Sequence, residues 1–285
     1  MTAEPFDRAL LDRRRTRWSR EGQTPPLFLA RHVAQDLAER LSLVQRRFET
    51  GLDLGGDGGE CARAVNATGQ VGRLVRLDKT AEGEDALVGD IEALPAQPES
   101  FDLVVSNLGL HLTNDTPGAL VQIRRALRPD GLFLGTLFGG ETLNELRAAL
   151  IAAETELSGG ASPRVLPFAE LRDAGGLLQR AGFALPVIDQ DRLTIRYDTM
   201  FQLMADIRAM GGANVLHARS RRPVSRRLFL RAAEIYAQRF ADPDGRVRAT
   251  FDVIHLSGWR PHESQQKPLK PGSAKASLAE ALKAR

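Results

Sequence analysis

The sequence predicts an α/β fold with a mostly parallel sheet, and three observations lead to this prediction. Short apolar runs alternate with segments of helical spacing between residues 49 and about 140, as in a buried parallel sheet. A glycine-rich turn at residues 53–59 follows the first of these runs. A late segment, 248–258, partly alternates apolar and polar residues as a strand does. We therefore expect seven strands, of which a late one runs antiparallel.

The composition is that of an ordinary globular protein of 285 residues, with 42% hydrophobic and 26% charged residues. No run approaches the roughly 18 consecutive apolar residues of a membrane-spanning helix. Residues 1–21 mix arginines with acids and lack the apolar core of a secretory signal. The single cysteine, Cys61, is expected to be a small buried residue, and it favours a reducing, cytoplasmic setting. The net charge of +3 does not by itself indicate nucleic acid, and we expect no nucleic-acid partner.

The first half of the chain is expected to hold a helical extension, residues 1–48, and then the parallel strands. A Pro25-Pro26 break precedes an amphipathic run of apolar residues in the extension. The members of that run are Leu29, Val33, Leu37 and Leu41. The apolar runs that predict strands cover residues 51–54, 73–77, 86–88, 103–105 and 132–138.

The second half is expected to complete the main domain, 49–258, and to end in a loose tail, 259–285. A helix follows the fifth strand and carries Leu143, Leu146, Leu150 and Leu157 on one face. Two strand-like segments, 183–188 and 192–197, come next as a pair. A helical insertion covers about 199–240, and its methionines indicate a core face or a lid over a cleft. Nothing in the composition indicates a linker between independent domains.

The glycine-rich turn is the first candidate binding site. Glycine has no Cβ, so the backbone of such a turn can approach a ligand closely. The amides of the turn and of the following helix favour the carboxylate of an amino-acid ligand. Taken alone, such a turn also occurs simply where a helix packs on a strand. The candidate cofactor residues of this turn are Asp53, Gly55, Gly56, Asp57 and Gly58.

Three polar residues at the ends of later strands strengthen this interpretation. Asp78 ends the second strand, where a carboxylate can accept both ribose hydroxyls of a nucleoside. Asp90, followed by Ile91, comes after the third strand, where it can accept an adenine amino hydrogen. Asn107 follows the fourth strand, at the edge of the sheet where open α/β folds bind ligands. Each aspartate has the alternative role of a helix cap or turn residue, but their joint spacing favours a ligand.

These motifs resemble those of a known family. The order of Asp53-Leu54-Gly55, Asp78, Gly89-Asp90 and Leu127-Arg128-Pro129-Asp130-Gly131 is similar to that of class I methyltransferases that act on malonyl-acyl carrier protein. Longer motifs resemble the family of the mitochondrial complex I assembly factor five and its bacterial relatives. They are Phe6-Asp7-Arg8, Leu110-His111-Leu112-Thr113-Asn114-Asp115, Phe138-Gly139-Gly140-Glu141-Thr142-Leu143, Pro167-Phe168 and Gly258-Trp259-Arg260-Pro261-His262-Glu263-Ser264-Gln265.

The resemblance implies a Rossmann-like fold and S-adenosylmethionine as cofactor. It further implies a protein substrate, a subunit of respiratory complex I, in which an arginine is hydroxylated. The setting it implies is a bacterial cytoplasm, with contact at the inner membrane as a further expectation. The sequence departs from the family pattern at Asp57, which stands where a glycine usually faces the methionine part of the cofactor. It also places only eleven residues between Asp78 and Asp90.

Two residues near the same edge of the sheet are candidates for the chemistry. His111 could orient a substrate or accept a proton, because imidazole titrates near neutral pH; packing or capping is the alternative. Glu141, after the fifth strand, could line the cleft and hold a guanidinium by paired hydrogen bonds, or it could simply begin the next helix. No His-x-Asp/Glu arrangement is present in the sequence, and we expect no metal site.

Six arginines with no intervening acid form the remaining feature of the sequence. They are Arg219, Arg221, Arg222, Arg226, Arg227 and Arg231. They indicate either a solvated helix face or a docking patch for an acidic protein or an anionic membrane. Three functions therefore stay open: modification of a protein arginine by hydroxylation or methylation, methylation of an acyl-carrier or small carboxylate substrate, and non-catalytic assembly of a complex.

Overall fold

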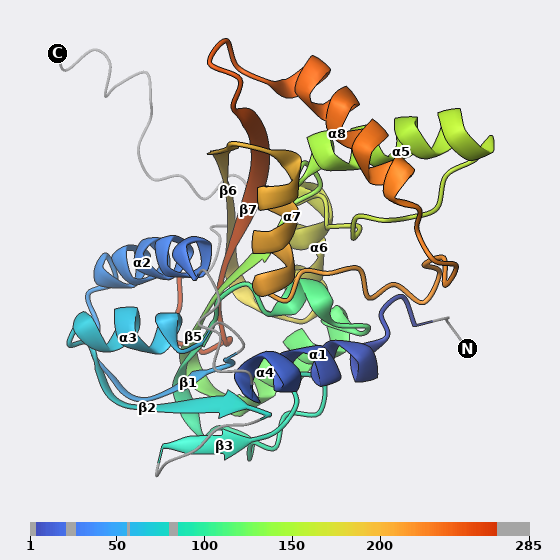
Figure 1. Ribbon diagram of the computed structural model, residues 1–285. Coiled ribbons are helices and arrows are strands. Elements are labelled where there is room, and N and C mark those ends of the chain that lie inside the picture. Colours follow the sequence, from blue (N-terminus) through green and yellow to red (C-terminus); the bar gives the residue numbers. More distant parts are fainter. Residues whose placement is uncertain (1–3, 21–26, 56–57, 80–84, 267–285) are drawn as a thin grey trace, which may run out of the picture.

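The computed structural model (Figure 1) describes residues 4–20, 27–55, 58–79 and 85–266. Its centre is a seven-stranded sheet in the order β3-β2-β1-β4-β5-β7-β6. The strands are β1 Phe48–Asp53, β2 Val71–Asp78, β3 Ala86–Val88, β4 Phe101–Ser106, β5 Leu127–Phe138, β6 Ala184–Tyr197 and β7 Val247–Trp259. Strands β1 to β5 pair in parallel, and β7 runs antiparallel to β5 and to β6. The predicted fold class is confirmed.

Helices cover both faces of the sheet because its central strands are apolar on both sides. The helices are α1 Arg8–Arg20, α2 Phe28–Ser42, α3 Glu60–Ala67, α4 Thr116–Ala126, α5 Asn144–Ser158, α6 Leu171–Arg180, α7 Met200–Ala209 and α8 Arg226–Phe240, with one 3-10 turn, η1, at Leu110–Leu112. One face packs against α2 and α3, where Leu37 and Cys61 are buried. The other face packs against α4 and α6, through Ile123 and Leu178. All six residues of β4 are buried between these layers.

A second core lies at the far end of β6 and β7, where α5, α7 and α8 gather (Figure 1). Its largest fully buried side chains include Tyr236 and Phe251. Glu145 of α5 is buried and accepts hydrogen bonds from the amide nitrogen and the hydroxyl of Thr250 in β7. The helices of the predicted insertion, α7 and α8, therefore share one core with α5 and do not form a separate unit.

One predicted detail is wrong. The two strand-like segments 183–188 and 192–197 form a single strand, β6, without a turn between them. The polar residues between the two predicted segments, Asp189 and Asp191, stay in register with β7. Arg40 of α2 pairs with both carboxylates, at 2.9 and 3.0 Å. Pairing with β7 and this distant cation therefore hold a polar stretch in an extended conformation that its local sequence does not favour. Within the described residues, no helix is both long and apolar enough to cross a membrane.

Candidate functional site

The glycine-rich turn begins where β1 ends, at the centre of the sheet. Asp53 is fully buried, and its Oδ1 accepts a hydrogen bond of 3.2 Å from the amide nitrogen of Gly55. Gly55 has φ of +58°, and a Cβ at this position would lie 2.0 Å from the carbonyl oxygen of Leu77. The chain can therefore turn away from β1 and pass this close to β2 only with glycine at position 55.

The turn continues into α3 through two more glycines in the left-handed region. Gly58 has φ of +72° and Gly59 has φ of +83°, directly before the helix begins. This conformation places the start of α3 beside the end of β1, as the sequence predicted for a strand-turn-helix unit. Gly56 and Asp57 lie outside the described residues, so their expected contact with a cofactor stays a prediction.

The nucleoside cavity, as we name it, opens beside this turn at the carboxyl ends of β1 and β2. Its wall contains four of the predicted cofactor residues. The cavity is lined by Arg8, Leu11, Leu54, Gly55, Leu77, Asp78, Lys79, Gly89, Asp90, Ile91, Gly109 and Leu112. Parallel strands end at one edge of the sheet, which is why lining residues spread over positions 54–112 meet here.

Both aspartates of the nucleoside cavity already bind cations of the same chain. Asp78 pairs with Arg76 at 2.9 Å. Asp90 pairs with Arg8 at 2.8 Å and with Lys79 at 2.9 Å. Burial would raise the pKa of Asp90, but the hydrogen bond from the amide of Glu92 and the pairs with Lys79 and Arg8 lower it to about 2. Asp90 is therefore a carboxylate at any physiological pH.

A second cavity, which we call the apolar chamber, contains two of the other predicted residues, Asn107 and His111, whereas Asp53 and Gly58 line neither cavity. It is lined by Leu27, Leu29, Ala30, Asn107, Leu108, His111, Leu112, Phe138, Thr142, Leu143, Leu166, Phe168, Ile207, Met210, Gly212 and Phe251. Leu112 lines both cavities, so the segment that follows β4 forms the wall between them. The insertion contributes Ile207 and Met210, which agrees with the predicted lid over a cleft.

Polar groups of the apolar chamber are held in fixed positions. Asn107 donates from Nδ2 to the carbonyl oxygen of Ala30 at 2.8 Å and accepts from the hydroxyl of Thr136 at 3.1 Å. The ring of His111 packs against those of Phe138 and Phe168, with centroids 4.8 and 5.9 Å apart. His111 thus lies where a substrate in the chamber would meet it, next to the wall of the nucleoside cavity.

Glu141 does not share this position. Its side chain is exposed and accepts a hydrogen bond of 2.8 Å from Asn144. It belongs to the lining of neither cavity, whereas its neighbour Thr142 lines the apolar chamber. We therefore assign no role in the site to Glu141.

The structure adds residues to the site that local patterns did not indicate. Phe138 and Phe168 supply the aromatic walls, and Arg8 and Lys79 line the nucleoside cavity. Arg8 and Phe168 stand in the motifs Phe6-Asp7-Arg8 and Pro167-Phe168 that carry the family resemblance, which is the signal that could have found them. Lys79 could have been noticed because it directly follows Asp78.

One group of potential metal ligands occurs among the described residues, namely Asp36, Asp191 and His255. The Nε2 atom of His255 lies 3.1 and 3.2 Å from the two carboxylates. Arg40 also pairs with both carboxylates, at 3.2 and 3.0 Å. Burial and the charge of Arg40 lower the pKa of His255. The carboxylates thus already pair with a cationic side chain, and the group forms an ion-pair network joining α2 to β6 and β7.

The six arginines that lie close together in the sequence have different surroundings in the structure. Arg219 pairs with Asp7 at 3.0 Å, and Arg231 pairs with Glu156 at 2.7 Å. The other four members, Arg221, Arg222, Arg226 and Arg227, are exposed. The interpretation as a docking patch therefore applies to these four and stays a prediction.

Comparisons with known proteins agree with the fold and with this arrangement of cavities. The family model described as "Methyltransferase domain" matches residues 52–135, from the glycine-rich turn to β5. Mouse "Arginine-hydroxylase NDUFAF5, mitochondrial" is 39% identical over 98% of this chain and 84% of its own. "Malonyl-[acyl-carrier protein] O-methyltransferase" of Halorhodospira halophila is 34% identical over 90% of each chain.

Among solved structures, the YcgJ protein of Bacillus subtilis is similar in fold. It has a TM-score of 0.54 at 17% identity and covers 79% of this chain and 98% of its own. The identity to NDUFAF5 extends over nearly the whole chain, including the N-terminal segment and the insertion that the methyltransferase model does not match. The chain therefore belongs to the family of the NDUFAF5 arginine hydroxylases, within the class I methyltransferase superfamily whose cofactor is S-adenosylmethionine.

Proposed function

We propose that this protein binds S-adenosylmethionine and modifies an arginine side chain of a protein substrate, a subunit of respiratory complex I. The observation that carries this proposal is the apolar chamber, which lies beside the nucleoside cavity and shares a wall with it. The similarity to relatives named arginine hydroxylases supports the choice of arginine. The choice of partner rests on the family resemblance.

The residues of the nucleoside cavity fit the cofactor by their chemistry. Gly55 lines the cavity and lets the turn pass close to the backbone of β2, where any side chain would collide. Asp78, at the end of β2, would accept the ribose hydroxyls, and Ile91 would cover the adenine ring. Asp90, ionised at neutral pH, would accept the adenine amino hydrogen. When bound, S-adenosylmethionine supplies an electrophilic methyl group and a positive charge at the wall of the apolar chamber.

The apolar chamber suits an arginine side chain because that side chain has an apolar stem and a flat cationic end. The aliphatic walls would contact the methylenes. The rings of Phe138 and Phe168 would stack against the guanidinium, which is worth about 0.5–2 kcal/mol. No carboxylate of the described residues lines the chamber, so recognition would depend on stacking rather than on an ion pair. His111 would orient the guanidinium or accept a proton from it.

Two modifications are consistent with this site, and their atom balances differ. Hydroxylation takes one oxygen atom from dioxygen into a C–H bond, while two electrons and two protons from a reductant convert the other atom to water. Methylation transfers the methyl group to a nitrogen and releases a proton and S-adenosylhomocysteine. The modified subunit is therefore heavier than the unmodified one by one oxygen atom after hydroxylation and by one methylene after methylation.

Co-expression with complex I subunits, followed by intact-mass and fragment analysis, tests the proposal. We expect one subunit to gain an oxygen or a methylene on an arginine. Replacing His111→Gln should lower the modified fraction per unit time by tenfold or more, as loss of a proton acceptor does. His217→Gln is the matched control because His217 is exposed and lines neither cavity. An unmodified set of subunits would contradict the proposal.

A second candidate function is methylation of an acyl group on a carrier protein. A further cavity adjoins the apolar chamber through Leu143, Leu166 and Phe168, and Arg164 and Arg208 lie in its lining. An apolar channel with cations would suit an acyl thioester on an acidic carrier. The same mass measurement on malonyl-acyl carrier protein, with a gain of one methylene, would favour this function instead.

A further inference from the structure

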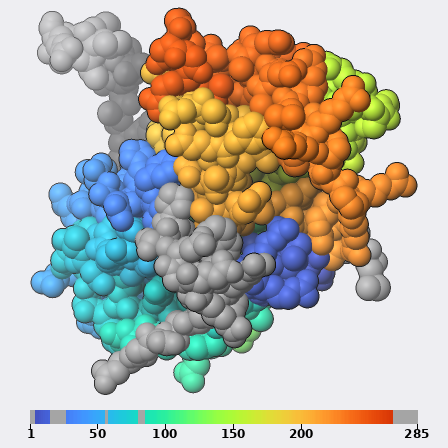
Figure 2. Space-filling model, in the orientation of Figure 1, coloured from blue at the N-terminus to red at the C-terminus, as the bar shows by residue number. Residues whose placement is uncertain are grey.

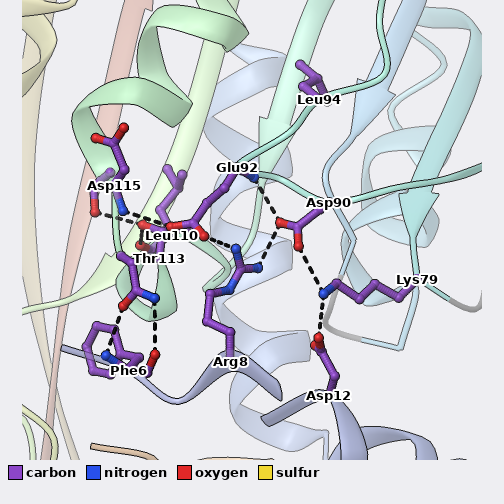
Figure 3. A network of polar contacts seen from close by, with 12 residues as sticks. Phe6, Arg8, Asp12, Lys79, Asp90, Glu92, Leu94, Leu110, Thr113 and Asp115 are labelled. Carbon is purple, nitrogen blue, oxygen red and sulfur yellow. Dashed lines mark hydrogen bonds and ion pairs between the residues drawn. The ribbon is translucent and has the colours of Figure 1, made fainter. Parts of the chain in front are cut away.

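The N-terminal segment, residues 5–14, lies across the nucleoside cavity. Arg8 points between the carboxylates of Asp90 and Glu92 and pairs with both (Figure 3). Lys79 lies between Asp12 of α1 and Asp90, and it pairs with both. Two cations and three carboxylates thus join α1 to the side of the cavity proposed for adenine. Asp90 pairs with both cations.

A second set of contacts fixes the segment next to η1. The amide nitrogen of Phe6 donates to Oδ1 of Asn114 at 2.8 Å, and Nδ2 of Asn114 donates to the carbonyl oxygen of Phe6 at 3.1 Å. Glu92 accepts a hydrogen bond of 2.7 Å from the amide of Asp115. The side chains of Phe6 and Leu11 are buried in one small core with Leu112 and Leu216.

With this segment in place, the nucleoside cavity is narrow. Its volume is about 50 Å³. Arg8, Leu11 and Lys79 form the wall that takes up the remaining space. Because Arg8 and Lys79 already pair with Asp90, an adenosine group that binds Asp90 has to displace them.

The other side of the segment is bound to the helical insertion. The amide of Asp7 donates to the carbonyl oxygen of Val215 at 2.7 Å, and the Asp7 carboxylate pairs with Arg219 at 3.0 Å. Arg14 donates to the carbonyl oxygen of Asn214 at 3.0 Å. On the face shown in Figure 2, the N-terminal segment in dark blue lies directly against the insertion in orange. Movement of the segment would therefore disturb residues next to Gly212, which lines the apolar chamber.

We propose that residues 5–14 form a gate that excludes S-adenosylmethionine from the nucleoside cavity when closed, with Arg8 and Lys79 as its latch. The inference rests on the proposed cofactor site and adds its regulation. Arg8, Asp90 and Glu92 keep 18%, 27% and 18% of their side-chain surface exposed, so water reaches the latch and can solvate its charges as the ion pairs break. Opening also loosens the contacts with the insertion, which links cofactor entry to the apolar chamber.

Surface plasmon resonance on the full chain, with S-adenosylmethionine in the flow, tests the gate. If only the open form binds, the apparent association rate is the intrinsic rate multiplied by the open fraction. We expect Arg8→Gln to raise the association rate about fivefold and to leave the dissociation rate within twofold. Lys79→Gln should act in the same direction. Raising the salt from about 0.05 to 0.5 M should accelerate association with the wild type more than with Arg8→Gln, because salt screens exposed pairs.

Arg13→Gln is the matched control because Arg13 is an exposed arginine of the same helix that lines neither cavity. Its association rate should equal that of the wild type. An association rate that is unchanged or lower in both Arg8→Gln and Lys79→Gln would overturn the gate. If neither the wild type nor either latch variant binds S-adenosylmethionine, that result would instead contradict the proposed cofactor site. A merely structural role of the latch would lower thermal stability without accelerating association.

Discussion

At the scale of single residues, Gly55 is the position where backbone conformation and close packing coincide. Its φ is +58°, and the nearest atom to a Cβ built there is a backbone oxygen that cannot rotate away. Gly69 provides a comparison, because its φ is +67° but no atom lies within 4 Å of such a Cβ. Comparing the two glycines therefore separates the free-energy cost of a left-handed conformation from that of a steric collision between a Cβ and the backbone.

We predict that Gly55→Ala lowers the free energy of unfolding by at least about 3 kcal/mol and abolishes cofactor binding. Gly69→Ala should cost only about 1–2 kcal/mol, which is the ordinary penalty for a left-handed non-glycine residue. Urea unfolding followed by circular dichroism measures both values. Equal losses in the two variants would show that the approach of residue 55 to β2 does not constrain the turn.

Residues whose positions follow from the strand ends were predictable from sequence, and those held by distant partners were not. Gly55, Asp78 and Asp90 follow directly from the order of strands and turns, and they line one cavity. Arg8 reaches Asp90 across 82 positions of the chain, and no local pattern encodes that contact. Glu141 follows β5 as Asn107 follows β4, yet it faces solvent, because the position of a strand end does not determine where its side chain points.

At the scale of elements, the spacing of apolar residues was sufficient to predict an element whose buried face consists of those residues. The four apolar residues predicted for one face of α2, Leu29, Val33, Leu37 and Leu41, are all buried. The same reasoning split β6 into two segments, because its continuity depends on β7, which comes 50 residues later and could not be read from the local pattern. The contact between α5 and β7 likewise involves Glu145, whose carboxylate accepts hydrogen bonds from Thr250. The apolar pattern of this helix predicted its leucine face but not the burial of this charged residue.

We predict that Glu145→Ala lowers the free energy of unfolding by about 2–3 kcal/mol. The carboxylate is buried and accepts from the amide and the hydroxyl of Thr250, so its removal leaves a buried donor without a partner. Glu141→Ala, at an exposed position three residues before α5 begins, should change stability by less than about 0.5 kcal/mol. Chemical denaturation compares the two, and similar small losses would mean that water replaces the carboxylate at Thr250.

At the scale of the whole molecule, the two cavities are built from segments that are far apart in the chain. The ends of the parallel strands meet at one edge of the sheet, and the N-terminal segment and the insertion cover that edge together (Figure 1). Asp7 and Arg219, which are 212 positions apart, join these covers. The sheet was predictable because it repeats one local pattern. The cover was not, because it depends on contacts such as the Asp7–Arg219 ion pair between the N-terminal segment and the insertion.

The ion pairs of this cover make the stability of the molecule depend on pH in the acid range. The pKa of Asp90 is about 2 in the folded chain and 3.8 ordinarily. A lowered folded pKa means that the pairs with Arg8 and Lys79 stabilise the fold fully above pH about 4. Their contribution is lost as the pH falls from about 4 to about 2. Because the Asp90 side chain is 27% exposed, we expect this contribution to be about 1–2 kcal/mol.

We therefore predict that Asp90→Asn is less stable than the wild type by about 1–2 kcal/mol at pH 5 to 7, and that this difference closes between pH about 4 and 2. Denaturant unfolding of both chains across that range measures it. Asp85→Asn is the control, because Asp85 pairs with Arg73 at a more exposed position, with 56% of its side chain accessible. Its difference from the wild type should stay below about 0.5 kcal/mol at every pH. A difference for Asp90→Asn that stays constant from pH 5 to pH 2 would mean that its charge does not hold the N-terminal segment on the sheet.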